Sequence, residues 1–167
     1  MRSKIVYFSH TEKTDMVSKV LAKALLSDLE RLKEKKSRKG FFGFIKAGFD
    51  ALMAKRSALV DPDYDLKGYA LVLIGTPIWA GRPTPAILSY LDKAKLKGKK
   101  VVVFCTMAGN EINDTLNILA SMAKKKGGEL AYMFSVKTGK RDDQTIRKIA
   151  SDFAKEVKSL INKKKTL

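Results

Sequence analysis

The sequence predicts an α/β protein built around a parallel sheet of five strands. Three observations favour this class. Apolar runs of strand length alternate with segments whose apolar residues recur at helical spacing, which is the pattern of βαβ units. The tripeptide Leu-Lys-Gly introduces two of those runs, at 66–68 and 96–98. A chain of 167 residues, 45% of them hydrophobic, can bury one core, so residues 1–167 are expected to form a single domain.

Each expected strand is a short apolar run. The strands are placed at 4–8, 29–32, 70–74, 101–105 and 130–136, and the second has the weakest signal. The first helix has its apolar stripe within 16–25, and the others span 41–53, 83–91, 110–126 and 142–161. Pro83 and Pro85 suit the first turn of the third helix, and Gly127 with Gly128 ends the fourth. Residues 162–167 form a basic tail that is expected to fray.

Composition excludes several classes of protein. No run approaches the ~18 apolar residues of a membrane helix, and the apolar run after Lys4 is too short for a signal peptide. A cytoplasmic protein is therefore expected. Cys105 is the only cysteine, which rules out an internal disulfide and a multi-cysteine metal site; it is expected to be buried and inert. Neither a P-loop nor a Gly-x-Gly-x-x-Gly motif occurs.

The chain is strongly basic. It has 34 Lys and Arg against 17 Asp and Glu, a formal charge of +17, which favours acidic partners. The basic runs are scattered and carry few interleaved aromatic residues, so a solvated Lys-rich surface is favoured over a specific nucleic-acid site. Residues 41–49 combine aromatic and basic side chains; packing of this helix on the sheet is favoured over contact with an anionic membrane surface.

Two segments have the composition of ligand-binding loops. Each follows an apolar run, and the carboxyl ends of parallel strands are where ligands bind in such sheets. The segment 9–14 places hydroxyl groups at the start of a helix, which suits a phosphate, although Ser9 and Glu12 also fit a helix-capping box. The segment 75–81 places Trp79 between two glycines, where its ring is expected either to stack on a planar ligand or to plug the next helix. A third loop, 106–110, ends the neighbouring strand and is expected to add backbone contacts.

Taken in order, these loops resemble the flavodoxin family. The segment Ser9-His10-Thr11-Glu12-Lys13-Thr14 is similar to the family's phosphate loop, Thr/Ser-x-Thr/Ser-Gly-x-Thr, except that Glu12 replaces the glycine. The segment Gly75-Thr76-Pro77-Ile78-Trp79-Ala80-Gly81 matches the family's Gly-Ser/Thr-Pro-x-Trp/Tyr-x-Gly throughout. The resemblance covers essentially the whole chain. It implies a three-layer, doubly wound sheet of strand order 2-1-3-4-5 with FMN at the switch point.

The resemblance also implies which residues contact FMN. Residues of the first loop would hold the phosphate, and the other two loops would flank the ring system: Ser9, His10, Thr11, Glu12, Lys13 and Thr14; Thr76, Pro77, Ile78, Trp79, Ala80 and Gly81; Thr106, Met107, Ala108, Gly109 and Asn110. His10 is the only histidine, and a solvent-facing position is favoured. His10-Thr11-Glu12 superficially matches a deaminase metal motif, but the required cysteine pair is missing.

Three functions follow in order of preference. The first is an FMN electron-transfer protein that docks acidic redox partners through its basic surface. The second is an FMN-dependent reductase of quinones or similar acceptors that uses NAD(P)H. The third is a flavodoxin-like binding module that has lost FMN through Glu12. No residue in the sequence is an obvious proton donor, which favours simple electron transfer.

Overall fold

The computed structural model describes residues 1–35, 55–109 and 114–163. Five parallel strands form the main sheet, in the order β2-β1-β3-β5-β6, and the short β4 pairs antiparallel with the end of β3. This order confirms the predicted doubly wound sheet. In chain order the elements are β1 (Ser3–Tyr7), α1 (Lys13–Leu25), β2 (Asp28–Arg31), β3 (Leu71–Trp79), β4 (Arg82–Pro83), α3 (Pro85–Lys93), β5 (Lys100–Met107), α4 (Thr115–Lys125), β6 (Glu129–Lys137) and α5 (Asp143–Lys163).

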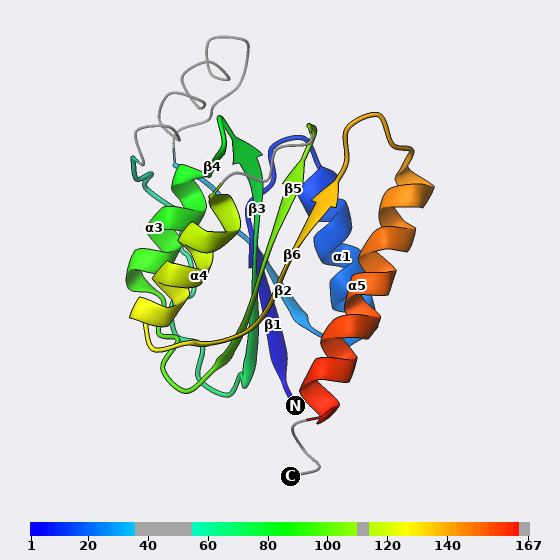
Figure 1. Cartoon of the computed structure of the whole chain (residues 1–167). Coiled ribbons are helices and arrows are strands. Elements are labelled where there is room, and N and C mark those ends of the chain that lie inside the picture. The colour runs from blue at the N-terminus through cyan, green and yellow to red at the C-terminus, as the bar shows by residue number, and fades with distance from the viewer. Residues whose placement is uncertain (36–54, 110–113, 164–167) are drawn as a thin grey trace.

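The sheet separates two hydrophobic cores. Helices α3 and α4 cover one face and α1 and α5 cover the other (Figure 1). Alternate residues of each central strand point into opposite cores: in β5, Val101 and Val103 pack toward α3 and α4, whereas Val102 and Phe104 pack toward α1 and α5. A strand covered on both faces must be apolar at every position, which explains why the central strands are continuous apolar runs in the sequence.

The predicted elements are largely confirmed, with corrections at their ends. Helix α4 ends as expected, since Gly127 has φ 80° and the Gly128 N–H donates to the Ala123 carbonyl at 3.0 Å. Pro83 belongs to β4 and not to the helix, which begins at Pro85. Helix α5 continues to Lys163, so residues 162 and 163, expected to belong to a frayed tail, are helical; residues 164–167 lie outside the described residues. The helix predicted at 41–53 lies outside the described residues.

Strand β3 is longer than predicted. It continues past residue 74 to Trp79, because Gly75, Thr76 and Pro77 still pair with Phe104, Cys105 and Thr106 of β5. Residues 76–79, expected to be loop, are therefore strand. Of the described helices, none combines the length and apolar character needed to cross a membrane. The described ranges also contain no cluster of His, Cys, Asp and Glu side chains suited to a metal ion.

Candidate functional site

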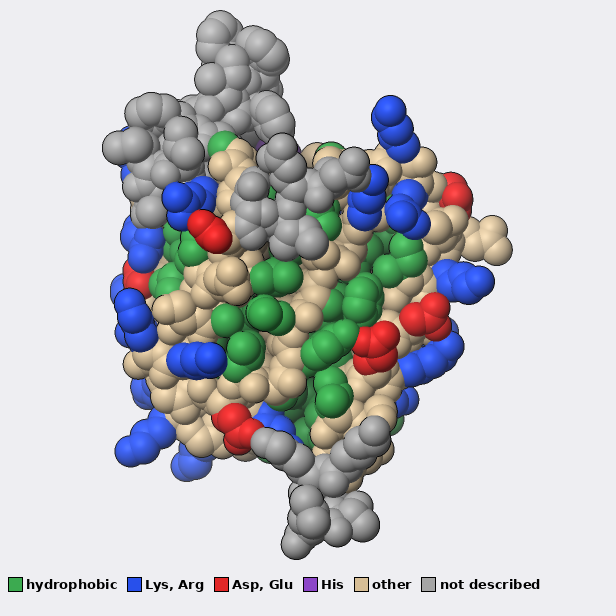
Figure 2. All heavy atoms as spheres, in the orientation of Figure 1, with side chains coloured by type: hydrophobic (Ala, Val, Ile, Leu, Met, Phe, Trp, Pro, Cys, Tyr) green, Lys and Arg blue, Asp and Glu red, His purple; other side chains and the backbone are tan. Residues whose placement is uncertain are grey.

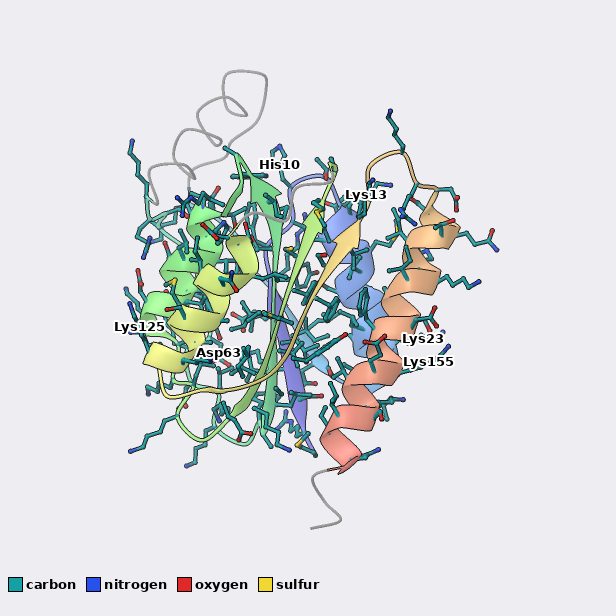
Figure 3. All side chains as sticks on the ribbon, in the orientation of Figure 1. His10, Lys13, Lys23, Asp63, Lys125 and Lys155 are labelled. Atoms are coloured by element: carbon teal, nitrogen blue, oxygen red, sulfur yellow. The ribbon has the colours of Figure 1, made fainter. Side chains whose placement is uncertain are left out.

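The candidate site lies at the carboxyl edge of the sheet. Strands β1, β3 and β5 all end at the top in Figure 1, where α1 and α5 begin. The chain leaves β1 toward β2 and leaves β3 toward β5, so the two connections run in opposite directions. In open parallel sheets, ligands bind at the strand ends where the connections reverse in this way. Figure 3 shows His10 and Lys13 at this same edge. The topology therefore brings the predicted loops together.

The first loop keeps a glycine-like backbone at Glu12. This residue has φ 61° and ψ −5°, in the left-handed region, and precedes the first turn of α1. Its carbonyl accepts from the Met16 N–H at 2.9 Å. A residue with a Cβ in this conformation costs about 1 kcal/mol relative to the right-handed region. The position where the resemblance expected glycine thus adopts the backbone that glycine favours, despite its side chain.

Two of the three hydroxyls predicted to hold a phosphate are engaged inside the protein. The buried Ser9 Oγ accepts from the Asp15 N–H at 3.2 Å and so caps α1. The buried Thr14 hydroxyl lies 2.8 Å from the hydroxyl of Thr106 at the end of β5. Only Thr11 of the three is exposed. The hydroxyls at positions 9 and 14 are therefore engaged within the protein, which leaves the backbone N–H groups of this loop as its main candidate donors to an anion.

Those N–H groups are available. Within residues 1–35, 55–109 and 114–163, no acceptor pairs with the backbone N–H groups of Thr11, Glu12 and Lys13. The first N–H groups of a helix have no partner within the helix, and a residue in the left-handed region turns successive N–H groups toward one side. Together with the helix dipole, this arrangement suits an anion such as a phosphate.

The second predicted loop is a β-hairpin. Trp79 pairs with Arg82, and the two residues between them, Ala80 and Gly81, have φ values of 46° and 73°. Two positive φ values in a two-residue turn define the type I′ hairpin. The expectation that Trp79 lies within a loop is wrong, because it ends strand β3 and is only 8% exposed.

Trp79 joins the first and second segments. Its ring packs edge-on against Phe8 and against His10, each with a centroid separation of 5.6 Å. His10 remains exposed, as expected, although its ring contacts the indole. The Thr76 hydroxyl also serves packing, because it accepts from the Thr84 N–H at 3.1 Å and ties β3 to the start of α3. At the turn of this hairpin, Ala80 is exposed and Gly81 is half-buried.

The third segment is only partly a loop. Thr106 and Met107 complete β5, whereas Ala108 and Gly109 follow it and Asn110 lies outside the described residues. Gly139 packs directly on this segment, since a Cβ there would lie 1.9 Å from the Ala108 carbonyl oxygen. A cavity of about 490 Å³ lies alongside, lined by Ala108, Gly109, Lys137, Gly139, Lys140 and Arg141.

Arg31 is a candidate site residue that sequence reasoning missed. It ends β2, and its Nη2 donates to the Ser9 carbonyl at 3.1 Å and to Glu12 Oε1 at 2.5 Å. Hydrogen bonds with Glu12 raise the pKa of Arg31 despite partial burial. The predicted strand order could have indicated this contact. Because β2 and β1 are parallel neighbours, their carboxyl ends share one edge of the sheet, and the last residue of β2 lies beside the end of β1, where the first loop begins.

Asp15 lies at the centre of a cluster of polar side chains near the start of α1. It accepts from the Tyr7 hydroxyl at 2.6 Å and pairs with Lys19 at 2.7 Å. Burial opposes ionisation of Asp15, but the hydrogen bonds from Lys19 and Tyr7 outweigh it and hold the pKa of Asp15 below its usual value. Burial, followed by the hydrogen bond to Asp15, raises the pKa of Tyr7, so the phenol stays protonated. This group positions α1 under the loop.

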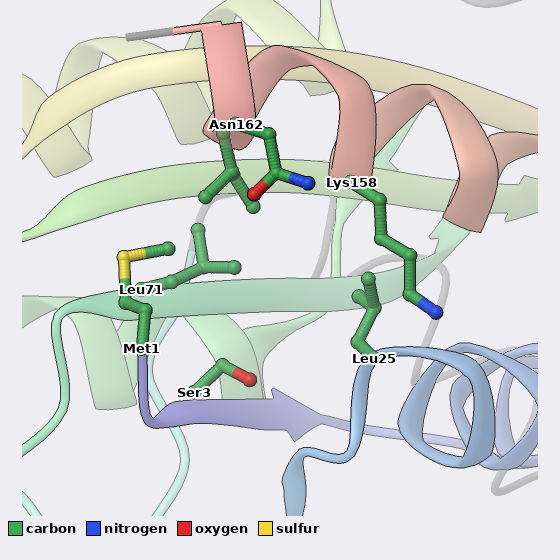
Figure 4. A pocket seen from close by; sticks show the side chains of 7 residues that line it. Met1, Ser3, Leu25, Leu71, Lys158 and Asn162 are labelled. Atoms are coloured by element: carbon green, nitrogen blue, oxygen red, sulfur yellow. The ribbon is translucent and has the colours of Figure 1, made fainter. Parts of the chain in front are cut away.

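Another cavity lies at the opposite edge of the sheet. It has a volume of about 350 Å³ and is formed where β1 and β3 begin and α5 ends, as Figure 4 shows for Met1, Leu71 and Lys158. The Ser3 hydroxyl at its floor already pairs with Ser27 at 2.6 Å. This cavity contains none of the predicted site residues.

Comparison with known proteins supports the class of fold. No family model and no curated protein matches the sequence. Solved structures do match. A flavoprotein from Lactobacillus acidophilus, solved in complex with FMN, has a TM-score of 0.66 and 22% identity over 88% of this chain and 97% of that one. Flavodoxin 2 from Bacillus cereus has a TM-score of 0.62 and 19% identity, covering 92% of this chain and 95% of the other.

A third match is the two-electron reduced flavodoxin of Megasphaera elsdenii, with a TM-score of 0.56 and 16% identity over 92% of this chain and 98% of that one. Identities this low establish architecture and not function. The chain therefore has the flavodoxin-like fold, in agreement with the topology of its sheet.

Proposed function

We propose that this chain binds FMN non-covalently at the carboxyl edge of its sheet and transfers electrons through it. The observation that supports this most is the set of N–H groups of Thr11, Glu12 and Lys13, which have no acceptor in the described ranges and lie beside the Trp79–His10 contact. A set of candidate phosphate donors thus adjoins the packed pair of aromatic side chains Trp79 and His10 at a topological switch point. Bound FMN would supply the one- or two-electron chemistry.

The chain's own groups would bind and orient the cofactor. The N–H groups of residues 11–13 and the exposed Thr11 hydroxyl would hold the phosphate. The turn at Ala80 and Gly81 and the segment at Ala108 and Gly109 would flank the ring system with backbone donors and acceptors. The buried hydroxyl pair of Thr14 and Thr106 would keep the first and third segments at a constant separation.

Titration of the purified chain with FMN tests this function. We expect quenching of flavin fluorescence and a shifted absorption spectrum that saturate at one FMN per chain. Thr11→Ala is expected to weaken binding several-fold, by the loss of about one hydrogen bond to a charged group. Ser121→Ala removes an exposed hydroxyl of α4 and is the control. If the protein leaves the absorption spectrum of FMN unchanged, FMN binding is contradicted and the flavin-free binding module is favoured.

Electron transfer is tested with the loaded protein. We expect the reduced protein to pass electrons to an acidic acceptor protein at a rate that falls as salt is added, because the chain carries a charge of +17. A rate that is independent of salt would contradict docking through the basic surface.

The basic cavity beside Ala108 supports a second candidate, an NAD(P)H-dependent reductase. Lys140 and Arg141 line this cavity next to the segment proposed to flank the flavin. Cations in that place would suit the pyrophosphate of a nicotinamide dinucleotide. Oxidation of NAD(P)H by the FMN-loaded protein alone would favour the reductase. If NAD(P)H is not oxidised, the electron-transfer function is favoured instead.

A further inference from the structure

The guanidinium of Arg31 is held against the first loop on two sides. Its Nη2 donates to the Ser9 carbonyl at 3.1 Å, which fixes one edge of the group to the backbone. Its two Nη atoms also reach both oxygens of the Glu12 carboxylate, at 2.9 Å and 2.5 Å. Glu12 is the residue in the left-handed conformation that precedes α1. A cation thus lies beside the same N–H groups that are proposed to bind the phosphate.

Another anion can replace the Glu12 carboxylate at the two Nη atoms of Arg31. A planar guanidinium binds carboxylate and phosphate in the same two-pronged manner, so the two anions are alternatives for Arg31. The Glu12 side chain is 61% exposed and that of Arg31 is 36% exposed. Exposed ion pairs of this kind contribute little to folding, so the carboxylate can turn into solvent at small cost.

Asp15 does not compete for this role. Its Oδ1 is 3.6 Å from Arg31 Nη1, and its oxygens are held by Tyr7 and Lys19 at 2.6 Å and 2.7 Å. The buried Asp15 therefore keeps the guanidinium near the loop after Glu12 leaves, together with the Ser9 carbonyl. Lys13 points to a different partner, since its Nζ pairs with Asp143 at 2.8 Å.

We propose that Arg31 is a phosphate ligand of this site and that Glu12 is an internal anion that the phosphate of FMN displaces from it. The inference rests on the proposed function. It accounts for an acidic residue in a phosphate loop: Glu12 neutralises Arg31 when the loop is empty and reduces affinity by competing for it. The site then selects the phosphorylated flavin over riboflavin through a side-chain charge as well as through backbone N–H groups.

Dissociation constants for FMN and for riboflavin, measured by fluorescence quenching, separate these contributions. Arg31→Gln is expected to raise the dissociation constant for FMN about tenfold or more and to leave the dissociation constant for riboflavin unchanged. Glu12→Gln is expected to lower the dissociation constant for FMN by about three- to tenfold, again without effect on riboflavin binding. In the double variant the gain from Glu12→Gln should disappear, because the competitor matters only while Arg31 is present.

Two further variants control for folding and for total charge. Arg31→Lys keeps the positive charge but loses the two-pronged hydrogen bonding of the guanidinium, so an intermediate loss of FMN affinity is expected. Lys23→Gln removes a cation from the far end of α1, which Figure 3 shows well away from His10, and should leave the FMN-to-riboflavin ratio unchanged. Circular dichroism of each variant checks that it is folded.

The outcomes separate the two proposals. If wild-type protein binds both flavins and Arg31→Gln leaves their affinity ratio unchanged, the role of Arg31 is overturned and FMN binding stands. If neither flavin binds, the proposed function fails. Inorganic phosphate then tests the anion site alone: a rise in melting temperature with phosphate that Arg31→Gln abolishes supports Arg31 as a phosphate ligand, and no rise in wild type overturns it.

Discussion

Gly75 lies in β3 directly against the ring of Phe104 on β5. A Cβ at this position would be 2.2 Å from Phe104 Cζ. That ring stacks on Phe134 of β6 at a centroid distance of 5.4 Å, and Phe134 stacks on Phe153 of α5 at 4.3 Å. The absent side chain therefore makes room for a row of aromatic rings that joins two strands to a helix.

Gly75→Ala should overpack this row. We expect the free energy of unfolding to fall by about 2–3 kcal/mol, because the Phe104 ring is itself packed against Phe134 and cannot retreat. Urea unfolding measures the change. Gly109→Ala is the matched control, since its Cβ would meet nothing within 4 Å, and a change within about 0.5 kcal/mol is expected. Equal effects of the two substitutions would contradict this account.

At the scale of an element, β2 shows how ion pairs support an edge strand. Its four residues are mostly exposed, so it contributes little to either core. It pairs in parallel with β1, and its acidic side chains Asp28 and Glu30 form ion pairs with Arg2, just before β1, and with Lys4 of β1. Lys4 Nζ lies 2.6 Å from Glu30 Oε2 and 2.7 Å from Asp63 Oδ2, although Lys4 is only 6% exposed. Burial opposes the charge of Lys4, yet its two carboxylate partners raise its pKa overall.

Lys4→Met should leave the Glu30 and Asp63 carboxylates close together without their cation. Removing one partner of a mostly buried ion pair costs about 3 kcal/mol or more; because Asp63 is half exposed, we expect a loss of about 2 kcal/mol. Urea unfolding again provides the measurement. Lys67→Met, the control, removes an exposed cation and should change stability little. A loss no larger than that of Lys67→Met would show that the pair does not support β2.

At the scale of the whole molecule, positive charge dominates the surface. In Figure 2, Lys and Arg side chains surround the visible face, and few acidic groups lie between them. Apolar side chains gather in the middle of this view, over the edge of the sheet between α4 and α5. The 17 acidic side chains offset half of the 34 basic ones, so each carboxylate that ionises relieves repulsion within the folded chain.

Stability should therefore fall sharply in acid. The hydrogen bond from Lys4 holds the pKa of Asp63 below its usual value, and Lys19 and Tyr7 do the same for Asp15 against the effect of burial. Carboxyl groups with lowered pKa values stabilise the fold above their unfolded pKa of about 4, and this contribution is lost as the pH falls through the folded pKa values. We expect the melting temperature to drop below about pH 4 and to recover in part with added salt. A melting temperature that is flat from pH 6 to 3 would contradict this expectation.

The parallel sheet and its helices could be predicted from sequence because their signals are local. A strand buried on both faces must be an apolar run, as at 101–105, and a helix over a sheet must repeat its apolar residues at helical spacing, as in α1. The burial of Cys105 followed for the same reason and is confirmed. Prediction was weakest where such signals fade: β2 is mostly polar, and the ends of β3 and β5 continue through residues with the composition of loops.

The sequence by itself determined the class of fold and the segments that meet at the carboxyl edge of the sheet. Only the tertiary structure decided the direction and partners of the side chains within them: Trp79 packs in a hairpin, the Ser9 and Thr14 hydroxyls bond inside the protein, and Arg31 reaches the first loop. The physical reason is that periodicity and composition report burial along one segment. Contacts between the ends of different strands depend on strand order and register, which no single segment encodes.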